Sequence, residues 1–192
     1  MIDLIRAASD LQSFLLLKGW KFCFIGGIAV QQWGEPRLTR DIDVTILTGF
    51  GAEENFVKEL LSKYSARIDH AVEFALANRV LLLHIHNDIG IDISLGGLPF
   101  EESIIYRAKD IEILPDIKLR ICSPEDLIIL KCFASRAIDW HDVQTIIIRQ
   151  DKKNLDWNYI ELHLRPLVEL KGQPEILEKL LKLKNLHDPG LT

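Results

Sequence analysis

The sequence predicts an α+β protein in which a small mixed β-sheet, with helices packed on it, is followed by a C-terminal helical half. Three observations predict this class. Residues 41–47 (DIDVTIL) alternate polar and apolar side chains, which is typical of a strand with one buried face. Residues 2–18 repeat apolar side chains at helical spacing. From residue 123 onward the pattern is helical almost throughout, so we expect the strands to precede that point.

The elements before residue 96 follow from apolar patterning and from the residues that interrupt it. In chain order we expect a helix over 2–18, a strand over 21–25, a short helix ending near Gly34, a loop containing Pro36, the strand over 41–47, a helix over 53–64, and strands over 79–86 and 89–95. Gly19 and Gly26-Gly27 mark breaks, because glycine tolerates backbone conformations that end helices and strands. Asn87-Asp88, between the last two strands, is a hairpin signal. Residues 65–78 show no clear pattern.

The remaining elements are a helix over 99–108, two short strands near Pro115, and helices to the end with breaks near Ile138, Asp151 and Gly172. The helix that follows residue 122 has a clear beginning. Ser123 stands at the cap position and Pro124 at the first helical position, where its missing N–H costs nothing. We therefore expect two parts, a sheet domain over residues 1–120 and a helical region over 121–192.

Composition and charge exclude some classes of protein. The 192 residues are 48% hydrophobic and 27% charged, with a formal net charge of −5, which does not fit a protein held to nucleic acid mainly by bulk positive charge. No apolar run approaches the length of a bilayer span, so no membrane partner is expected. The three cysteines lack the spacing of metal ligands, which indicates buried thiols in a reducing, cytoplasmic environment.

Two aspartates in one strand raise the question of what compensates them. Asp41 and Asp43 project from the same face, where two like charges repel unless a cation lies nearby. Asp92 has the same setting in IGIDISL, residues 89–95. If the two strands pair side by side, three carboxylates converge, and such oxygen ligands suit Mg²⁺ or Mn²⁺ with phosphate and water. The alternative is a solvent-exposed strand face without a site.

Gly26-Gly27, between a strand and a helix, supplies a second indication. Backbone N–H groups at a helix N-terminus form an anion site, and glycines leave them unobstructed. By itself a Gly-Gly pair is usually a turn. Together with the carboxylates it predicts the two halves of a nucleotide–metal site, phosphate at the glycines and a divalent ion at the aspartates.

These residues carry a family resemblance. The pattern GG-x(13)-DID followed by an Asp-bearing strand resembles the DNA polymerase β-like nucleotidyltransferase superfamily, and GGIAVQQWG…RLTRDIDV is similar more narrowly to AbiEii-type toxins and related small bacterial nucleotidyltransferases. The resemblance implies a nucleotidyltransferase catalytic domain over 1–120. It assigns the metal and the catalysis to Asp41, Asp43 and Asp92, and nucleotide binding to Gly26, Gly27, Arg37, Thr39 and Arg40. Arg37 and Arg40 have a solvated loop as the rival interpretation.

The resemblance continues in SPEDLIILKCFASRAIDWHD, which is similar to the helical motif K-x(4)-R-x(2)-D-x(2)-D of that group. Lys131 fills the lysine position and is a candidate catalytic phosphate ligand; the alternative is a solvated lysine on a helix. Arg136, Asp139 and Asp142 are candidate supporting residues. Arg136 and Asp139 could equally form a structural ion pair. His84 and His86 lack a third close ligand and are interpreted as strand-face residues.

The expected function is therefore transfer of a nucleoside monophosphate from an NTP to an acceptor hydroxyl, with Mg²⁺ or Mn²⁺ as cofactor. The acceptor stays open between an RNA end, a protein side chain and a small molecule. A toxin–antitoxin or phage-defence role would add a cognate protein partner. The alternative from another class is a non-catalytic, antitoxin-like partner-binding protein that keeps the fold. Dependence of nucleotide transfer on Asp43 would separate the two.

Overall fold

The computed structural model describes residues 1–86 and 89–186, so the hairpin turn expected at Asn87-Asp88 lies outside the described residues. The chain divides into two compact units. Unit 1 contains Met1–Ile28 and Leu38–Cys122, and unit 2 contains Ala29–Arg37 and the chain from Ser123 onward.

Unit 1 is built on a mixed sheet, as expected from the sequence. In the described part of the chain the strand order is β3-β4-β5-β2-β1-β7-β6, with β2 parallel to β5, β1 parallel to β7, and the other neighbours antiparallel. The strands are β1 (Phe22–Phe24), β2 (Asp41–Leu47), β3 (Ser65–Ala66), β4 (Val80–Ile85), β5 (Ile89–Gly96), β6 (Lys109–Leu114) and β7 (Ile117–Ile121). Strand β2 is central, which places its side chains between those of β5 and β1.

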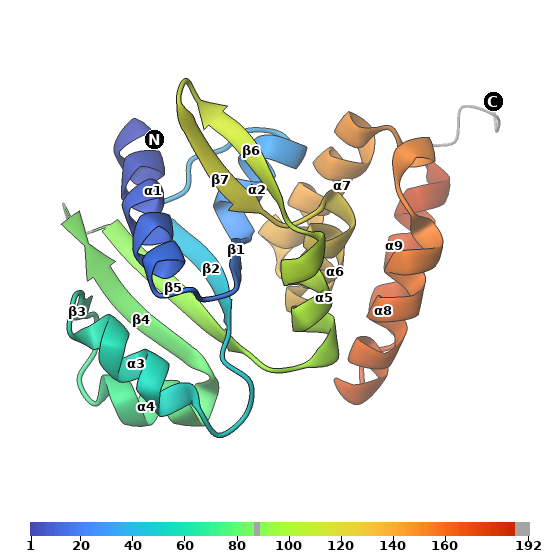
Figure 1. Ribbon diagram of the computed structural model, residues 1–192. Coiled ribbons are helices and arrows are strands. Elements are labelled where there is room, and N and C mark those ends of the chain that lie inside the picture. The colour runs from blue at the N-terminus through green and yellow to red at the C-terminus, as the bar shows by residue number, and fades with distance from the viewer. Residues whose placement is uncertain (87–88, 187–192) are drawn as a thin grey trace. The chain divides into compact units, whose positions relative to one another are not determined.

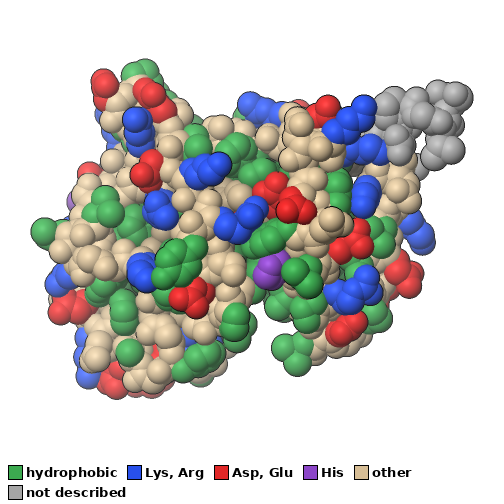
Figure 2. Space-filling view, turned by 45° about the vertical axis from the view of Figure 1, so that its right-hand side comes forward, with side chains coloured by type: hydrophobic (Ala, Val, Ile, Leu, Met, Phe, Trp, Pro, Cys, Tyr) green, Lys and Arg blue, Asp and Glu red, His purple; other side chains and the backbone are tan. Residues whose placement is uncertain are grey.

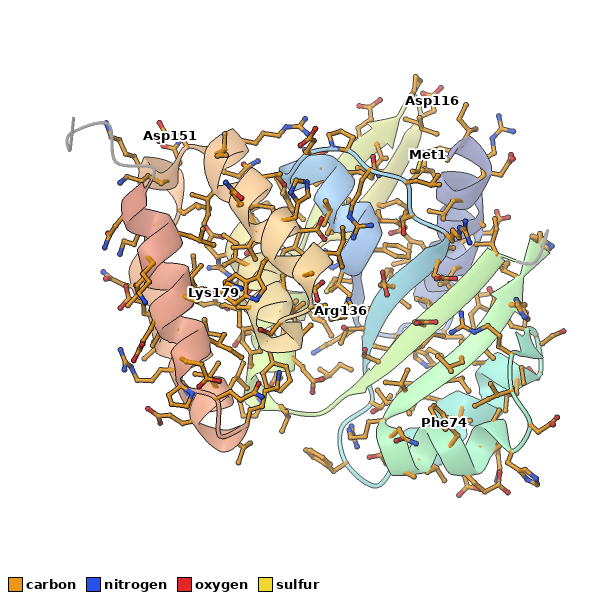
Figure 3. All side chains as sticks on the ribbon, turned by 180° about the vertical axis from the view of Figure 1, so that it is seen from behind. Met1, Phe74, Asp116, Arg136, Asp151 and Lys179 are labelled. Carbon is orange, nitrogen blue, oxygen red and sulfur yellow. The ribbon has the colours of Figure 1, made fainter. Side chains whose placement is uncertain are left out.

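The helices of unit 1 bury the apolar face of this sheet and leave part of the other face open. They are α1 (Ile2–Leu17), α3 (Glu53–Leu61), α4 (Ala71–Asn78) and α5 (Pro99–Arg107). Helix α1 packs on β7 and β2, and the β2 side chains Ile42, Val44 and Ile46 are fully buried. Figure 1 shows α1 in front of the sheet, whereas Figure 3, from behind, shows β2, β5 and β4 without a helix over them.

Unit 2 consists of helices. They are α2 (Gly26–Trp33, whose first residues belong to unit 1), α6 (Pro124–Ala134), α7 (Ala137–Gln150), the 3-10 turn η2 (Lys152–Asn154), α8 (Trp157–Leu170) and α9 (Glu175–Leu186). Helix α6 is central and contacts α7, α8 and α9. The predicted cap is present, because the Ser123 side chain accepts a hydrogen bond from the Asp126 N–H. None of the described helices combines the length and hydrophobicity needed to cross a bilayer.

The sequence pattern does not indicate two of the observed elements, and it predicts one break between helices at a different residue from the observed one. Residues 65–78 contain β3 and α4, which the sequence pattern did not indicate. Strand β3 has only two residues, and α4 lies between His70 and Arg79, whose left-handed φ angles of 52° and 55° form helix ends without glycine. The helix break expected near Ile138 occurs at Ser135, another non-glycine residue in the left-handed region (φ 59°). Such positions leave little trace in a sequence.

Candidate active site

The pairing that brings the carboxylates together is present. Parallel strands β2 and β5 place Asp43 directly beside Asp92, and Asp41 beside Gly90. Residues paired in this way lie on the same face of a sheet, so all three aspartates share the open face. Their neighbours Ile42 and Ile91, on the opposite face, are fully buried. The alternation of polar and apolar residues in these strands therefore puts the aspartates on one face of the sheet and the buried isoleucines on the other.

Arg67, which no sequence motif indicates, lies between two of these carboxylates. Arg67 follows β3, and its backbone N–H donates to the Leu82 carbonyl of β4. Its Nη2 lies 2.7 Å from Asp92 Oδ1 and its Nη1 lies 3.5 Å from Asp41 Oδ1. In this structure the cation that compensates Asp41 and Asp92 is therefore a guanidinium.

Gly90 makes room for this arrangement. A Cβ at position 90 would clash with the Asp41 carboxylate and would meet Arg67 Nη1. A side chain at position 90 would therefore push the Asp41 carboxylate and the Arg67 guanidinium out of their present positions, whereas the backbone conformation at this position does not call for glycine. Neither Arg67 nor Gly90 stands in a recognisable motif; the position of Gly90 two residues before Asp92 was the only available signal.

Asp92 is half-buried, and its surroundings shift its pKa. Burial raises the pKa of Asp92, and the Asp41 charge adds to this, while Arg67 opposes it; the pKa remains above its ordinary value. Asp92 Oδ1 is buried, and no donor in the described part of the chain meets it with hydrogen-bond geometry. The Arg67 contact at 2.7 Å is therefore an ion pair that leaves this oxygen without a well-directed hydrogen bond.

The glycine pair lies directly against Asp43. Gly26 has a left-handed φ of 55°, and a Cβ at this position would clash with the Asp43 carboxylate. The Gly27 N–H donates to Asp43 Oδ2 at 3.2 Å, and a Cβ at position 27 would clash with Thr39 Oγ1. Helix α2 begins at these glycines, so its N-terminal N–H groups and positive dipole end face the carboxylate site.

The donor set fits a divalent metal ion by its chemistry. Three carboxylates on one face, one of them with a buried oxygen that has an ion pair but no donor of hydrogen-bond geometry, are hard ligands of the kind that Mg²⁺ takes. Their present arrangement is organised around Arg67 and the Gly27 N–H. Accordingly, among the described residues no three His, Cys, Asp or Glu side chains are grouped closely enough to hold one ion.

The other predicted residues gather in unit 2. Arg37 Nε and Nη2 lie 2.8 and 2.9 Å from the two carboxylate oxygens of Asp142. Lys131 Nζ lies 2.7 Å from Asp142 Oδ2 and 3.0 Å from Asp139 Oδ1. Arg136 donates from both its side chain and its backbone N–H to Asp139, which caps the N-terminus of α7. We call these five residues the Lys131 cluster.

The Lys131 cluster is buried at its centre. Asp139 and Asp142 are 0% and 1% exposed, and Lys131 is 6% exposed, so the solvated-lysine interpretation is wrong. Burial alone would raise the pKa of Asp139, but hydrogen bonds from Arg136 and Lys131 outweigh it and leave the pKa lowered. The pKa of Asp142 is lowered in the same way by Arg37 and Lys131, against its burial. Both carboxylates are therefore charged partners of the three cations.

The predicted residues thus fall into two groups. The structure brings Gly26, Gly27, Thr39, Asp41, Asp43 and Asp92 together in unit 1, and Arg37, Lys131, Arg136, Asp139 and Asp142 together in unit 2. Arg40, next to Asp41 in the chain, is exposed. His84 is a strand-face residue as expected, and it pairs with Gly90 on the face that carries Asp41.

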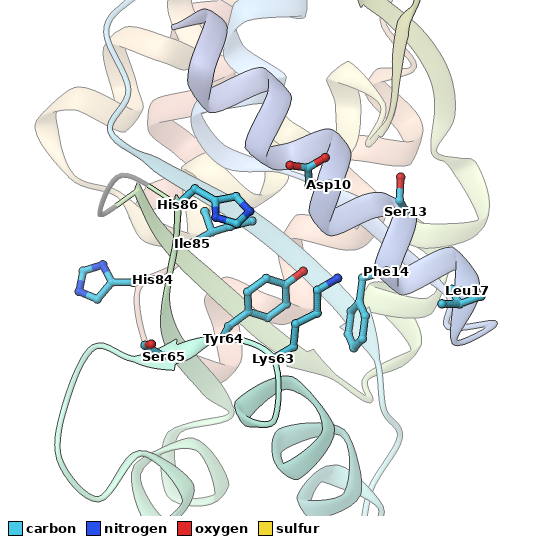
Figure 4. Close-up of a pocket in the computed structure, with 10 residues that line it drawn as sticks. All are labelled: Asp10, Ser13, Phe14, Leu17, Lys63, Tyr64, Ser65, His84, Ile85 and His86. Atoms are coloured by element: carbon cyan, nitrogen blue, oxygen red, sulfur yellow. The ribbon is translucent and has the colours of Figure 1, made fainter.

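A separate cavity of about 670 Å³ lies between α1 and the β3–β4 edge of unit 1. Figure 4 shows Tyr64 and Lys63 pointing towards Asp10, Ser13 and Phe14 of α1. Burial, and to a lesser degree the Asp10 charge, raises the pKa of Tyr64 to about 12. None of the predicted site residues lines this cavity.

Comparison with known families identifies the class of protein. Residues 15–186 match the family described as "Nucleotidyl transferase AbiEii toxin, Type IV TA system". Because the match covers most of the chain, the protein belongs to the AbiEii family and is a nucleotidyltransferase. The resemblance drawn from the two sequence motifs is confirmed.

Solved structures support the fold. An antigenic nucleotidyltransferase-like protein from Paracoccidioides brasiliensis is 18% identical, with a TM-score of 0.52 over 94% of this chain and 92% of that chain. The solution structure of the antibiotic-resistance factor ANT(2″)-Ia is 18% identical, with a TM-score of 0.50 over 94% of this chain and 95% of that chain. At this identity the likeness establishes the fold alone. No curated protein matches the chain.

Proposed function

We propose that this nucleotidyltransferase is metal-dependent and transfers a nucleoside monophosphate from an NTP to an acceptor hydroxyl at the Asp41–Asp43–Asp92 face. The observation that carries the proposal is the β2–β5 register, which sets Asp43 beside Asp92 on the open face of the sheet. Family membership supports the class of reaction.

The reaction needs charge neutralisation and positioning more than covalent chemistry by the protein. The acceptor oxygen attacks the α-phosphorus, the bond to the β-phosphate oxygen breaks, pyrophosphate leaves, and the hydroxyl proton passes to a carboxylate or to water. Asp41, Asp43 and Asp92 would hold Mg²⁺ or Mn²⁺, which supplies the charge that stabilises the attacking and leaving oxygens.

The glycines and the preceding loop are assigned to the nucleotide. Gly26 and Gly27 begin α2, and we assign phosphate oxygens to the N–H groups of this helix end, where the Gly27 N–H at present donates to Asp43. The Gly27–Asp43 hydrogen bond supports this assignment, because the start of α2 then lies against a carboxylate to which we assign the metal. Thr39 touches the same turn, and the exposed Arg40 adds positive charge beside Asp41.

For the Lys131 cluster we propose a supporting role. Its three cations face two carboxylates, so these five side chains keep one positive charge in excess. Lys131 acts by holding Asp139 and Asp142, and Arg37 by fixing Asp142. Arg136, whose side chain is 70% exposed, is the member of the cluster that reaches solvent.

The acceptor remains a choice between an RNA end, a protein side chain and a small molecule. The net charge of −5 disfavours a large RNA bound by bulk charge. Figure 2 displays another side of the molecule than the open sheet face seen in Figure 3, and basic and acidic side chains are interspersed there. Membership in a toxin family supports a cognate antitoxin protein as partner.

The test is transfer of label from α-labelled NTPs in the presence of Mg²⁺ and candidate acceptors. Asp43→Asn keeps the shape of the side chain and removes its charge, so we expect it to lower transfer by about 10²-fold or more. Asp116→Asn is the matched control, because Asp116 is exposed at the β6–β7 turn (Figure 3) and should leave transfer unchanged. Equal transfer by wild type and Asp43→Asn would contradict the proposed site.

A further inference from the structure

The candidate for a new role is Arg67, a residue outside every motif. Its guanidinium touches two of the three carboxylates to which metal binding is assigned, at 2.7 Å from Asp92 and 3.5 Å from Asp41. The side chain is 26% exposed, and Gly90 leaves the space in which the contact forms. This is a specific position, built by residues from β2, β5 and the segment after β3.

A guanidinium and a divalent ion at these carboxylates would compete. The guanidinium and the metal ion are both attracted by the negative charges of Asp41 and Asp92. A cation that lies within 4 Å of the Oδ1 atoms of both residues repels a second cation. Arg67 also satisfies Asp92 incompletely, since the buried Oδ1 has an ion pair but no well-directed hydrogen bond from the described residues. The Arg67 contact therefore neutralises the charge of Asp92 without giving its Oδ1 atom a well-directed hydrogen bond. This favours replacement of the guanidinium by a metal ion that can bind the oxygen directly.

We propose that Arg67 is the resident counter-ion of the site: it holds Asp41 and Asp92 when no divalent ion is bound, and it must leave both carboxylates when the metal enters. This inference rests on the proposed function, because it takes Asp41 and Asp92 as metal ligands. Arg67 is a positioning residue. It lowers the affinity of the free protein for metal and keeps the mutually repelling carboxylates together.

The experiment measures binding of Mn²⁺ alone, without nucleotide, by calorimetry or electron paramagnetic resonance. Arg67→Gln removes the competing charge and should tighten Mn²⁺ binding by about tenfold, the effect of roughly two partly exposed ion pairs. Arg67→Lys keeps the charge and should stay within about twofold of wild type. Lys109→Gln, on the edge strand β6 at the far end of the strand order, controls for the loss of one positive charge and should also stay within about twofold.

A second measurement uses the wild-type protein, so that it does not depend on the folding of a variant. The side-chain Nε–H resonance of Arg67, assigned with Arg67→Lys, should shift when Mg²⁺ is added, whereas that of Arg6 on α1 should not.

The outcomes are separable. Mn²⁺ binding that is unchanged or weaker in Arg67→Gln, together with an unmoved Arg67 resonance, would overturn the role of Arg67 while leaving Asp43-dependent transfer intact. Absence of Mn²⁺ binding by every variant and by wild type, with or without NTP, would overturn the proposed metal site and this inference with it.

Discussion

At the scale of single residues, the site depends on two glycines, Gly26 and Gly90, at which a larger side chain would clash with a carboxylate. Gly26 has a left-handed φ, and a Cβ added at this position would clash with the Asp43 carboxylate. Gly90 has no unusual φ, yet its missing side chain is what lets Asp41 and Arg67 meet. Two of the glycines in the chain are thus tied to the geometry of carboxylates far from them in sequence.

Gly26→Ala should impair both stability and transfer. The left-handed φ alone costs an alanine about 1–2 kcal/mol, and the clash with Asp43 displaces that carboxylate in addition. The matched control is Gly19→Ala, which has a similar φ of 67° but open space around the added Cβ. We expect both variants to lose stability in urea unfolding and only Gly26→Ala to lose label transfer. A Gly26→Ala protein as active as Gly19→Ala would contradict the contact with Asp43.

At the scale of elements, the buried charges of unit 2 fix the α6–α7 connection. Lys131 lies near the end of α6, Asp139 in the first turn of α7, and Ser135 between them adopts the left-handed conformation. The cluster is arranged so that each buried carboxylate has two cationic partners, Lys131 and one arginine. Removing one member from the centre leaves the others incompletely paired.

Lys131→Met tests this arrangement. It retains most of the side-chain volume but leaves Asp139 and Asp142 buried beside one another with fewer cations, which should cost about 3 kcal/mol of unfolding free energy. Arg136→Gln, at a 70% exposed position, should cost less than about 1 kcal/mol. Both values come from urea unfolding at pH 7. Equal losses in the two variants would show that burial does not determine the strength of these pairs.

At the scale of the whole molecule, the two units are not consecutive halves of the chain. Residues 29–37 belong to unit 2, where the backbone of Trp33 and Gly34 accepts hydrogen bonds from Gln150 and Arg149, and the Glu35 N–H donates to Thr145. We nevertheless propose that residues 1–120 carry the catalytic site and that 121–192 form a helical region that supports it.

This interleaving predicts that residues 1–120 expressed alone will be less stable than the full chain, because residues 29–37 would lose their helical partners. The fragment should unfold at a temperature about 10 °C lower or more, as judged by circular dichroism. Supplying residues 121–192 as a separate chain should restore part of the loss. A fragment that melts as the full protein does would mean that residues 29–37 need no partner from the helical region.

Much of the fold could be predicted because local patterns specify it. The 41–47 strand was predicted with its observed bounds, since strict alternation marks a strand with one buried face, and Ser123-Pro124 marked the start of α6. Residues 65–78 could not be predicted, because β3 is held by its pairing with β4 and not by its own composition. Arg67 could not be predicted as a site residue either, because its partners Asp41 and Asp92 are distant from it in sequence.

The sequence by itself determined that three aspartates would face away from the core and that two glycines would open a helix beside them, because strand periodicity and glycine breaks are local properties. Only the tertiary structure decided which strands are neighbours, that Arg67 lies between Asp41 and Asp92, and that Lys131 is enclosed by carboxylates. Contacts between residues distant in sequence depend on how the elements pack, and a single charged side chain carries no local pattern that announces its partner.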